Sequence, residues 1–327
     1  MFDSLMFWVF LAATAAVFGL MPPAWVRARS AALISTSILV LALVVGIDPW
    51  FGVMLLIAVA WVTFAARLAE AFRGRRGLLL YLLGPVAIVW IAGKEASAYH
   101  FAWFQFIGFS FFFIKAWTLL KDVQDRRIER PDSFVVASYF LHFPTFVSGP
   151  MHLFGEFNRS LRAPQFPHFE ELIDVVFRLL LGFAKVKVLA PLFAPISLET
   201  LVASGPLSVT TLAVGSLAYS VVILANFSGY TDLAVATSRL IGMHVTENFN
   251  YPYAAPNIRE FWQRWHMSFT RVLTSYVFIP LSRRLQESLG DRPKAMMIAC
   301  TLVTFLFCGF WHGPTLNFLL WGLYHAL

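Results

Sequence analysis

Residues 295–313 read AMMIACTLVTFLFCGFWHG, an apolar run without Asp, Glu, Lys or Arg that ends at His312. At about 1.5 Å of rise per residue, a helix over this run crosses most of a hydrocarbon core about 30 Å thick. An ionisable residue in such a place is a functional candidate by default, and histidine can take and return a proton near neutral pH. The alternative is a structural histidine at a helix end, beside an interfacial tryptophan.

The rest of the chain is similarly apolar. Of its 327 residues, 59% are hydrophobic and 13% are charged, whereas soluble domains have about 45–50% and about 25%. A soluble fold is therefore excluded, and we predict an all-α, polytopic membrane protein with room for roughly ten helical crossings. The net charge of +7 comes from residues clustered between apolar runs, which indicates membrane topology and no nucleic-acid partner. Cys300 and Cys308 lie in one apolar run, so we expect inert core thiols.

Basic residues occupy alternate breaks between the apolar runs, after the first, third and fifth. By the positive-inside rule the N-terminus is extracytoplasmic and the loop 121–133 is cytoplasmic. The first run is interpreted as a retained span because Asp3 stands where a signal peptide needs a basic segment. Residues 134–150 are short and contain Pro144, which predicts a re-entrant element. The predicted spans are residues 5–20, 31–47, 50–66, 78–92, 101–120, 172–189, 208–225 and 295–311, with a last helix from about residue 315.

Two further polar stretches lie where a bilayer makes them costly. Arg264, Trp265 and His266 form part of a polar but aromatic-rich region, residues 226–280, which predicts interfacial or partly re-entrant helices around a cavity. An interfacial belt with basic anchors is the structural alternative. Residues 226–232, NFSGYTD, follow an apolar span and are expected to break one helix and cap the next. The sequence has no Walker A loop, no dinucleotide or serine-hydrolase motif and no strong metal-site spacing.

Seven short motifs follow one another along the chain: GFSF (108–111), FPTFVSGP (143–150), GFAKV (182–186), NFSGYTDLA (226–234), ENFNYPY (247–253), NIREFWQRWHMS (257–268) and WHG (311–313). In this order they resemble the membrane-bound O-acyltransferase (MBOAT) family, and most of all its bacterial branch that acylates alginate and teichoic acid. The resemblance covers roughly residues 107–325 and divides the chain into N-terminal spans, 1–100, and a core, 101–327.

The resemblance implies a multi-helix bundle with re-entrant segments around a central funnel, in the bacterial inner membrane. It places the two family histidines at His312 and His266, as catalytic residues approached from opposite sides. We expect His312 to act as a general base in acyl transfer, while the role of His266 stays open. The substrate-binding candidates are Asn248, Tyr230, Asp232, Trp311 and Arg264.

The resemblance further implies a thioester donor, acetyl-CoA or an acyl carrier, and a polysaccharide or cell-envelope acceptor. A periplasmic SGNH-type protein is a possible partner, and no metal or bound cofactor is expected. A transporter or flippase is an alternative, although it predicts paired, similarly interrupted halves, and none is found. A non-catalytic scaffold that delivers acyl groups is another alternative.

Some positions depart from the family pattern. Asn226 stands where the bacterial branch commonly has Asp, Thr274 and Ser275 replace an Arg-Asp pair, and Pro314 replaces a small residue. These changes leave the acyl-transfer motifs in place and bear on the choice of acceptor and partner. The chain ends at Leu327, where family members continue with further hydrophobic segments, so we expect a short or a truncated member.

Overall fold

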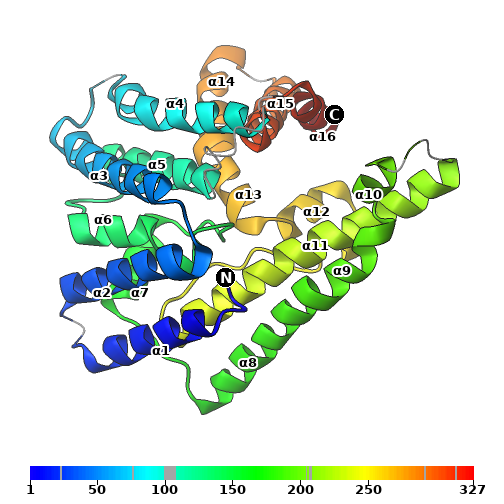
Figure 1. Ribbon diagram of the computed structural model, residues 1–327. Coiled ribbons are helices and arrows are strands. Elements are labelled where there is room, and N and C mark those ends of the chain that lie inside the picture. Colours follow the sequence, from blue (N-terminus) through cyan, green and yellow to red (C-terminus); the bar gives the residue numbers. More distant parts are fainter. Residues whose placement is uncertain are drawn as a thin grey trace. The chain divides into compact units, whose positions relative to one another are not determined.

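A computed structural model of the chain describes residues 1–22, 24–75, 77–98, 108–203, 205, 208–290, 292–313 and 315–327, and excludes the side chains of 93–98 and 289. The first part of the predicted span 101–120, together with Arg76 and Pro314, lies outside the described residues. In the described part all regular structure is helical (Figure 1), which confirms the all-α prediction.

The chain forms two compact units, each built from two segments. Unit 1 comprises residues 1–47 and 141–249, and unit 2 comprises residues 48–140 and 250–327. This division follows packing and differs from the sequence-based division at residue 100.

Unit 1 is dominated by two long helices, α8 and α11, that pack along each other. Gly182 and Gly229 allow their backbones to approach, because a Cβ atom on Gly229 would lie 2.9 Å from the Gly182 carbonyl oxygen. The helices of unit 1 are α1 (Leu5–Leu20), α2 (Val26–Leu39) with its π-helical continuation η1 (Val40–Val45), η3 (Phe143–Thr145), α7 (Phe154–Arg162), α8 (Phe169–Ala184) with π-helical η4 (Lys185–Leu189), α9 (Ala190–Phe193), η5 (Ala194–Ile196), α10 (Leu198–Ala203) and α11 (Val209–Leu240).

Unit 2 brings together α3, α5 and α6 on one side and a closely packed hairpin of α15 and α16 on another. The pairing of α15 with α16 places Gly309 and Gly322 against the partner helix backbone. The helices of unit 2 are α3 (Pro49–Ala71), α4 (Leu78–Ala98), α5 (Phe109–Gln124), α6 (Ser133–Phe140), η6 (Pro252–Ala254), α12 (Ile258–Arg264), α13 (Met267–Leu273), π-helical η7 (Thr274–Phe278), α14 (Ile279–Leu289), α15 (Pro293–His312) and α16 (Leu316–Ala326).

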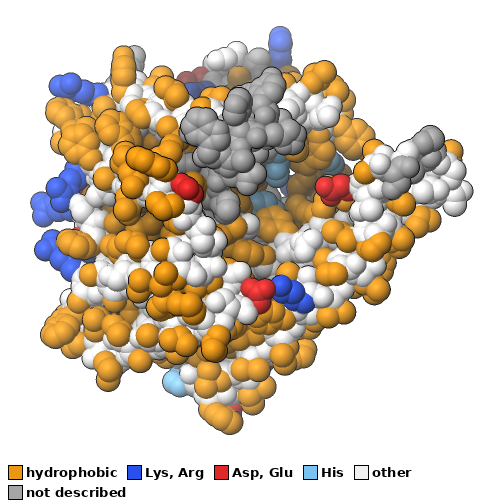
Figure 2. Space-filling view, in the orientation of Figure 1, with side chains coloured by type: hydrophobic (Ala, Val, Ile, Leu, Met, Phe, Trp, Pro, Cys, Tyr) orange, Lys and Arg blue, Asp and Glu red, His pale blue; other side chains and the backbone are white. Residues whose placement is uncertain are grey.

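Four helical segments of the described chain are long and apolar enough to cross a membrane: Val26–Val45, Pro49–Ala71, Val209–Leu240 and Pro293–His312. Two shorter apolar helices cover Leu5–Leu20 and Leu78–Ala92. Figure 2 shows hydrophobic side chains over most of the visible surface, as expected where helices face hydrocarbon. Cys300 and Cys308 are buried free thiols, as expected for core positions.

The predicted helix break at residues 226–232 is wrong, because α11 continues through this stretch from Val209 to Leu240. Ser228 and Gly229 are buried there, and the absent side chain of Gly229 lets α8 approach closely. Tertiary packing therefore outweighs the helix-breaking tendency of these residues.

Residues 134–150 form no spanning helix. They contain α6, which ends at Phe140, and the 3-10 turn η3 over Phe143–Thr145. At about 1.5 Å per residue, the eight residues of α6 are far too short to cross a bilayer. This agrees with the short, interrupted element expected from the sequence.

Candidate functional site

His266 is a buried imidazole at the junction of α12 and α13 in unit 2, with 5% of its surface exposed. Its backbone is left-handed, with φ of 46°, and its carbonyl accepts the first amides of α13 from Phe269 and Thr270. The rings of Phe111 and Phe269 lie 6.3 and 5.2 Å from its ring centroid. Burial, with a smaller effect of His312, lowers the pKa of His266 to about 3. The imidazole is therefore neutral near pH 7.

His312 is the last residue of α15 and is exposed, in contrast to His266. Its ring stacks on Phe318 of α16, with centroids 5.9 Å apart, and meets the edge of Trp321 at 5.6 Å. The helix end and these two aromatic rings orient the imidazole while leaving it accessible. Accessibility is what a proton-transfer group requires if it is to reach a substrate hydroxyl.

The ring of Trp311 contacts the rings of both histidines. Its ring lies 4.8 Å from the His312 ring and 6.4 Å from the His266 ring, centroid to centroid. The indole nitrogen donates to the Ser110 carbonyl oxygen at 3.2 Å, which fixes the ring against α5. Unit 2 thus brings together three of the predicted site residues, and sequence reasoning gave no role to their neighbours Phe269, Phe318 and Trp321.

Arg264, the fourth predicted site residue in unit 2, forms an ion pair within its own helix. Its guanidinium donates to Glu260 at 2.9 Å, and its carbonyl accepts the Asn250 amide at 3.0 Å. These contacts hold the end of α12 and the chain that leads into it. The structure thus gives Arg264 a local positioning role and does not test the predicted role in substrate binding.

Asn248 and Tyr230 lie in unit 1. Asn248 is fully buried and donates to the hydroxyl of Thr231 on α11 at 3.5 Å. Tyr230 donates from its phenol to the Pro144 carbonyl oxygen at 3.5 Å, and its ring contacts Phe2. Their predicted role in substrate binding stays a prediction.

Asp232, the third unit 1 candidate, lies between two cations. Its carboxylate accepts from Arg178 Nε at 3.0 Å and from Lys185 Nζ at 2.6 Å, and Arg178 also pairs with Glu247. These ion pairs connect α8 and η4 to α11. Each carboxylate oxygen of Asp232 thus accepts a hydrogen bond from a basic side chain of this protein.

We expect Asp232→Asn to lower the free energy of unfolding of the chain by about 1 kcal/mol, since it weakens two partly exposed ion pairs. Thermal unfolding in detergent at low and high salt measures the effect, which should shrink as salt screens the wild-type pairs. Lys187→Gln is the matched control, because Lys187 pairs with Asp3 where both side chains are 55% exposed, and it should change little. An unchanged midpoint for Asp232→Asn would contradict this structural role.

Asp122 and Tyr276 form a polar contact that sequence reasoning missed. The Tyr276 hydroxyl donates to Asp122 at 2.7 Å, and Arg127 donates to the other oxygen at 3.1 Å. Burial raises the pKa of Asp122 above its usual range, although both donors oppose the shift. The sequence signal that could have indicated this contact is the carboxylate of Asp122, which lies just beyond the apolar run 101–120. The contact joins the end of α5 to η7 and so supports the segment after α13.

Metal ligation finds no support in the described residues, where no group of three or more His, Cys, Asp or Glu side chains is placed to hold an ion. The chemistry that this geometry allows is proton transfer by an exposed histidine beside a second, neutral one.

Residues 53–327 match the sequence model of the MBOAT, membrane-bound O-acyltransferase family. The chain belongs to this family. The MBOAT match contains both His266 and His312, and it extends further towards the N-terminus than the resemblance at residues 107–325.

Curated MBOAT-like relatives are similar over part of their length. The chain is 31% identical over 226 residues to the probable alginate O-acetylase AlgI of Azotobacter vinelandii, covering 67% of this chain and 43% of that protein. It is 31% identical over 207 residues to the peptidoglycan O-acetyltransferase of Helicobacter pylori, covering 60% of this chain and 38% of that protein. It is 28% identical over 234 residues to the teichoic acid D-alanyltransferase of Streptococcus thermophilus, covering 68% of this chain and 55% of that protein. The chain thus spans about half the length of these relatives or less.

Proposed function

We propose that the protein transfers an acyl group, most simply acetyl, from a cytoplasmic thioester to a hydroxyl of an extracytoplasmic polysaccharide or cell-envelope polymer. The observation that carries this proposal is the pair of histidines beside Trp311, of which His312 is exposed and His266 is buried. The names of the relatives, which are acetyltransferases and D-alanyltransferases of polymers, support the substrate class. We place the protein in the bacterial inner membrane by the same analogy.

In the proposed reaction His312 accepts the proton of the acceptor hydroxyl as its oxygen attacks the thioester carbonyl carbon. The carbon–sulfur bond then breaks, and the thiolate that leaves takes the proton back from His312. The products are an oxygen ester and a free thiol, so protons and electrons balance. A general base of this kind contributes about 10²–10⁴-fold to the rate, and positioning of both substrates supplies much of the remainder.

His266 is assigned a positioning role in this proposal. Its buried ring packs against Phe111 and Phe269 and lies beside Trp311, so it helps to set the position of Trp311 and through it that of His312. A charged imidazole at this place would be penalised by burial among apolar rings. Its neutrality therefore keeps the surroundings of His312 free of a second positive charge.

Acetate labelling in whole cells tests the proposed function. Cells that produce the chain are fed radiolabelled acetate, and cell-envelope and secreted polymers are treated with mild base, which cleaves oxygen esters and releases label as acetate. We expect base-labile label above the level of cells that lack the chain, and we expect it to need His312. Equal labelling with and without the chain would overturn acyl transfer. Equal labelling with His312 and without it would favour a scaffold or a transporter.

A further inference from the structure

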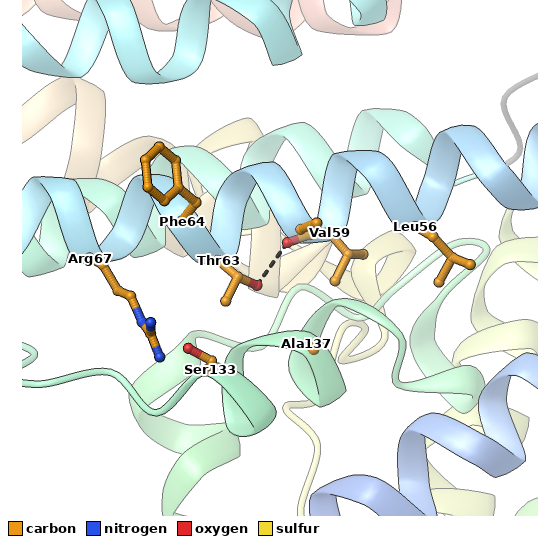
Figure 3. A pocket seen from close by; sticks show the side chains of 8 residues that line it. Leu56, Val59, Thr63, Phe64, Arg67, Ser133 and Ala137 are labelled. Carbon is orange, nitrogen blue, oxygen red and sulfur yellow. Dashed lines mark hydrogen bonds between the residues drawn. The ribbon is translucent and has the colours of Figure 1, made fainter.

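A groove of about 390 Å³ opens between α3 and α6 of unit 2 (Figure 3). It is separate from the histidines described above. Its size falls in the range of small-molecule sites, about 300–1,000 Å³. The groove is lined by Leu56, Val59, Ala60, Thr63, Phe64, Arg67, Ser133 and Ala137.

The long wall of the groove is apolar and belongs to a helix able to span the membrane, Pro49–Ala71. Leu56 and Phe64 expose 46% and 53% of their surface, so this face of α3 is open to hydrocarbon. The Thr63 hydroxyl donates its proton to the Val59 carbonyl oxygen at 2.7 Å, so this donor is satisfied within α3. A chain of methylene groups fits the chemistry of this wall.

The two remaining polar groups of the groove meet at one end. Arg67 extends from α3 towards Ser133 at the start of α6 (Figure 3). The Ser133 hydroxyl oxygen is buried and has no hydrogen-bond partner within the described part of the chain. A buried hydroxyl without a partner costs free energy, which an acceptor or donor on a ligand would restore.

Arg67 has no carboxylate partner among the described residues. The nearby Glu70 is committed elsewhere, since it accepts from the Arg130 amide at 2.9 Å and pairs with Arg73 at 3.5 Å. The carboxylate of Asp132 caps α6 by accepting from the amides of Phe134 and Val135. The end of the groove therefore presents an uncompensated guanidinium beside a buried hydroxyl.

We propose that this groove binds an anionic phospholipid, with an acyl chain along α3 and the phosphate at Arg67 and Ser133. A phosphate diester supplies oxygens that accept from both groups, and guanidinium is well suited to phosphate. Arg67 lies about one turn before the end of α3, a depth from which an arginine reaches the headgroup layer. Anionic lipids are enriched on the cytoplasmic face, where the sequence places this basic end of α3.

Lipid retention in native mass spectrometry tests this site on the intact chain. Protein purified in detergent is incubated with dioleoyl phosphatidylglycerol or with dioleoyl phosphatidylcholine, and the lipid-bound fraction is measured. We expect the wild type to retain the anionic lipid several-fold better. Arg67→Gln should lower its retention about tenfold, as expected for loss of one charge-assisted contact, and Ser133→Ala should lower it several-fold.

Two control variants distinguish binding in the groove from a general effect of positive charge on lipid retention. Arg75→Gln removes a charge from the loop that follows α3, at an exposed residue that packs over Phe72 and does not line the groove, and it should retain lipid like the wild type. Ala60→Phe fills the groove at an exposed position without a charge change, and it should lower retention of the anionic lipid as Arg67→Gln does. Equal retention of both lipids, or no response to Arg67→Gln, would overturn the proposal. Loss of a dimer in Ala60→Phe would do so too, because it would show a second copy in the groove. Unchanged thermal unfolding midpoints verify that each variant is folded.

Discussion

Replacement of His312 with glutamine is expected to lower the rate of acyl transfer by about 10²–10⁴-fold while the protein stays folded and inserted. The side chain is exposed at the end of α15, so the substitution removes a proton acceptor without opening a cavity. Transfer of label from acetyl-CoA to base-labile ester in membranes that contain the chain measures the effect. Retention of full activity in folded His312→Gln protein would refute the general-base mechanism.

Two control variants make this result interpretable. His244→Gln replaces an exposed histidine outside the proposed site, and its activity should equal that of the wild type. His266→Gln should lower the rate but keep the midpoint of the acidic limb of the pH–rate profile. The pKa of His266 is lowered to about 3, so its protonation falls below the pH range in which a general base near neutrality titrates. A shift of the acidic limb in His266→Gln would instead assign that titration to His266 and contradict the roles proposed for the two histidines.

Gly309→Val is expected to destabilise unit 2 strongly, because it forces a side chain into the contact between α15 and α16. A Cβ atom at Gly309 would lie 2.2 Å from the backbone oxygen of Phe318, and one at Gly322 would lie 2.5 Å from that of Phe305. Backbone atoms cannot yield as a side chain can, so α16 must move away from α15. We expect a loss of about 3 kcal/mol in the free energy of unfolding, the upper end of the range for overpacked sites, and a lower thermal unfolding midpoint in detergent.

Gly84→Ala is the matched control for Gly309, since it also lies inside a helix of unit 2 and nothing lies within 4 Å of its added Cβ atom. Its midpoint should be equal to the wild type or slightly higher, because alanine favours the helix. Gly309→Val should also reduce acyl transfer, because Trp311 and His312 follow directly on α15. A wild-type midpoint for Gly309→Val would show that α15 and α16 do not pack as described.

The candidate site was predictable from the sequence where a single residue carried an exceptional property. His312 ends an uninterrupted apolar run, and the family motifs pointed to His266 as well. The sequence did not indicate that Trp311 lies between them, because the positions of Phe111 and Trp311 depend on the packing of α5 against α15, elements about 200 residues apart. It also did not indicate that Asp232 is committed to Arg178 and Lys185.

Composition alone determined that this protein is a helical membrane protein, because 59% hydrophobic residues cannot be hidden from water within a soluble fold, and the motifs alone determined its family. Only the tertiary structure decided that α11 runs unbroken through residues 226–232 and that one histidine is buried while the other is exposed. The physical reason is that local sequence sets which helices form and which faces are apolar. The burial of His266 and the close contacts of Gly229 and Gly309 depend instead on which helices, distant in the sequence, pack against these residues.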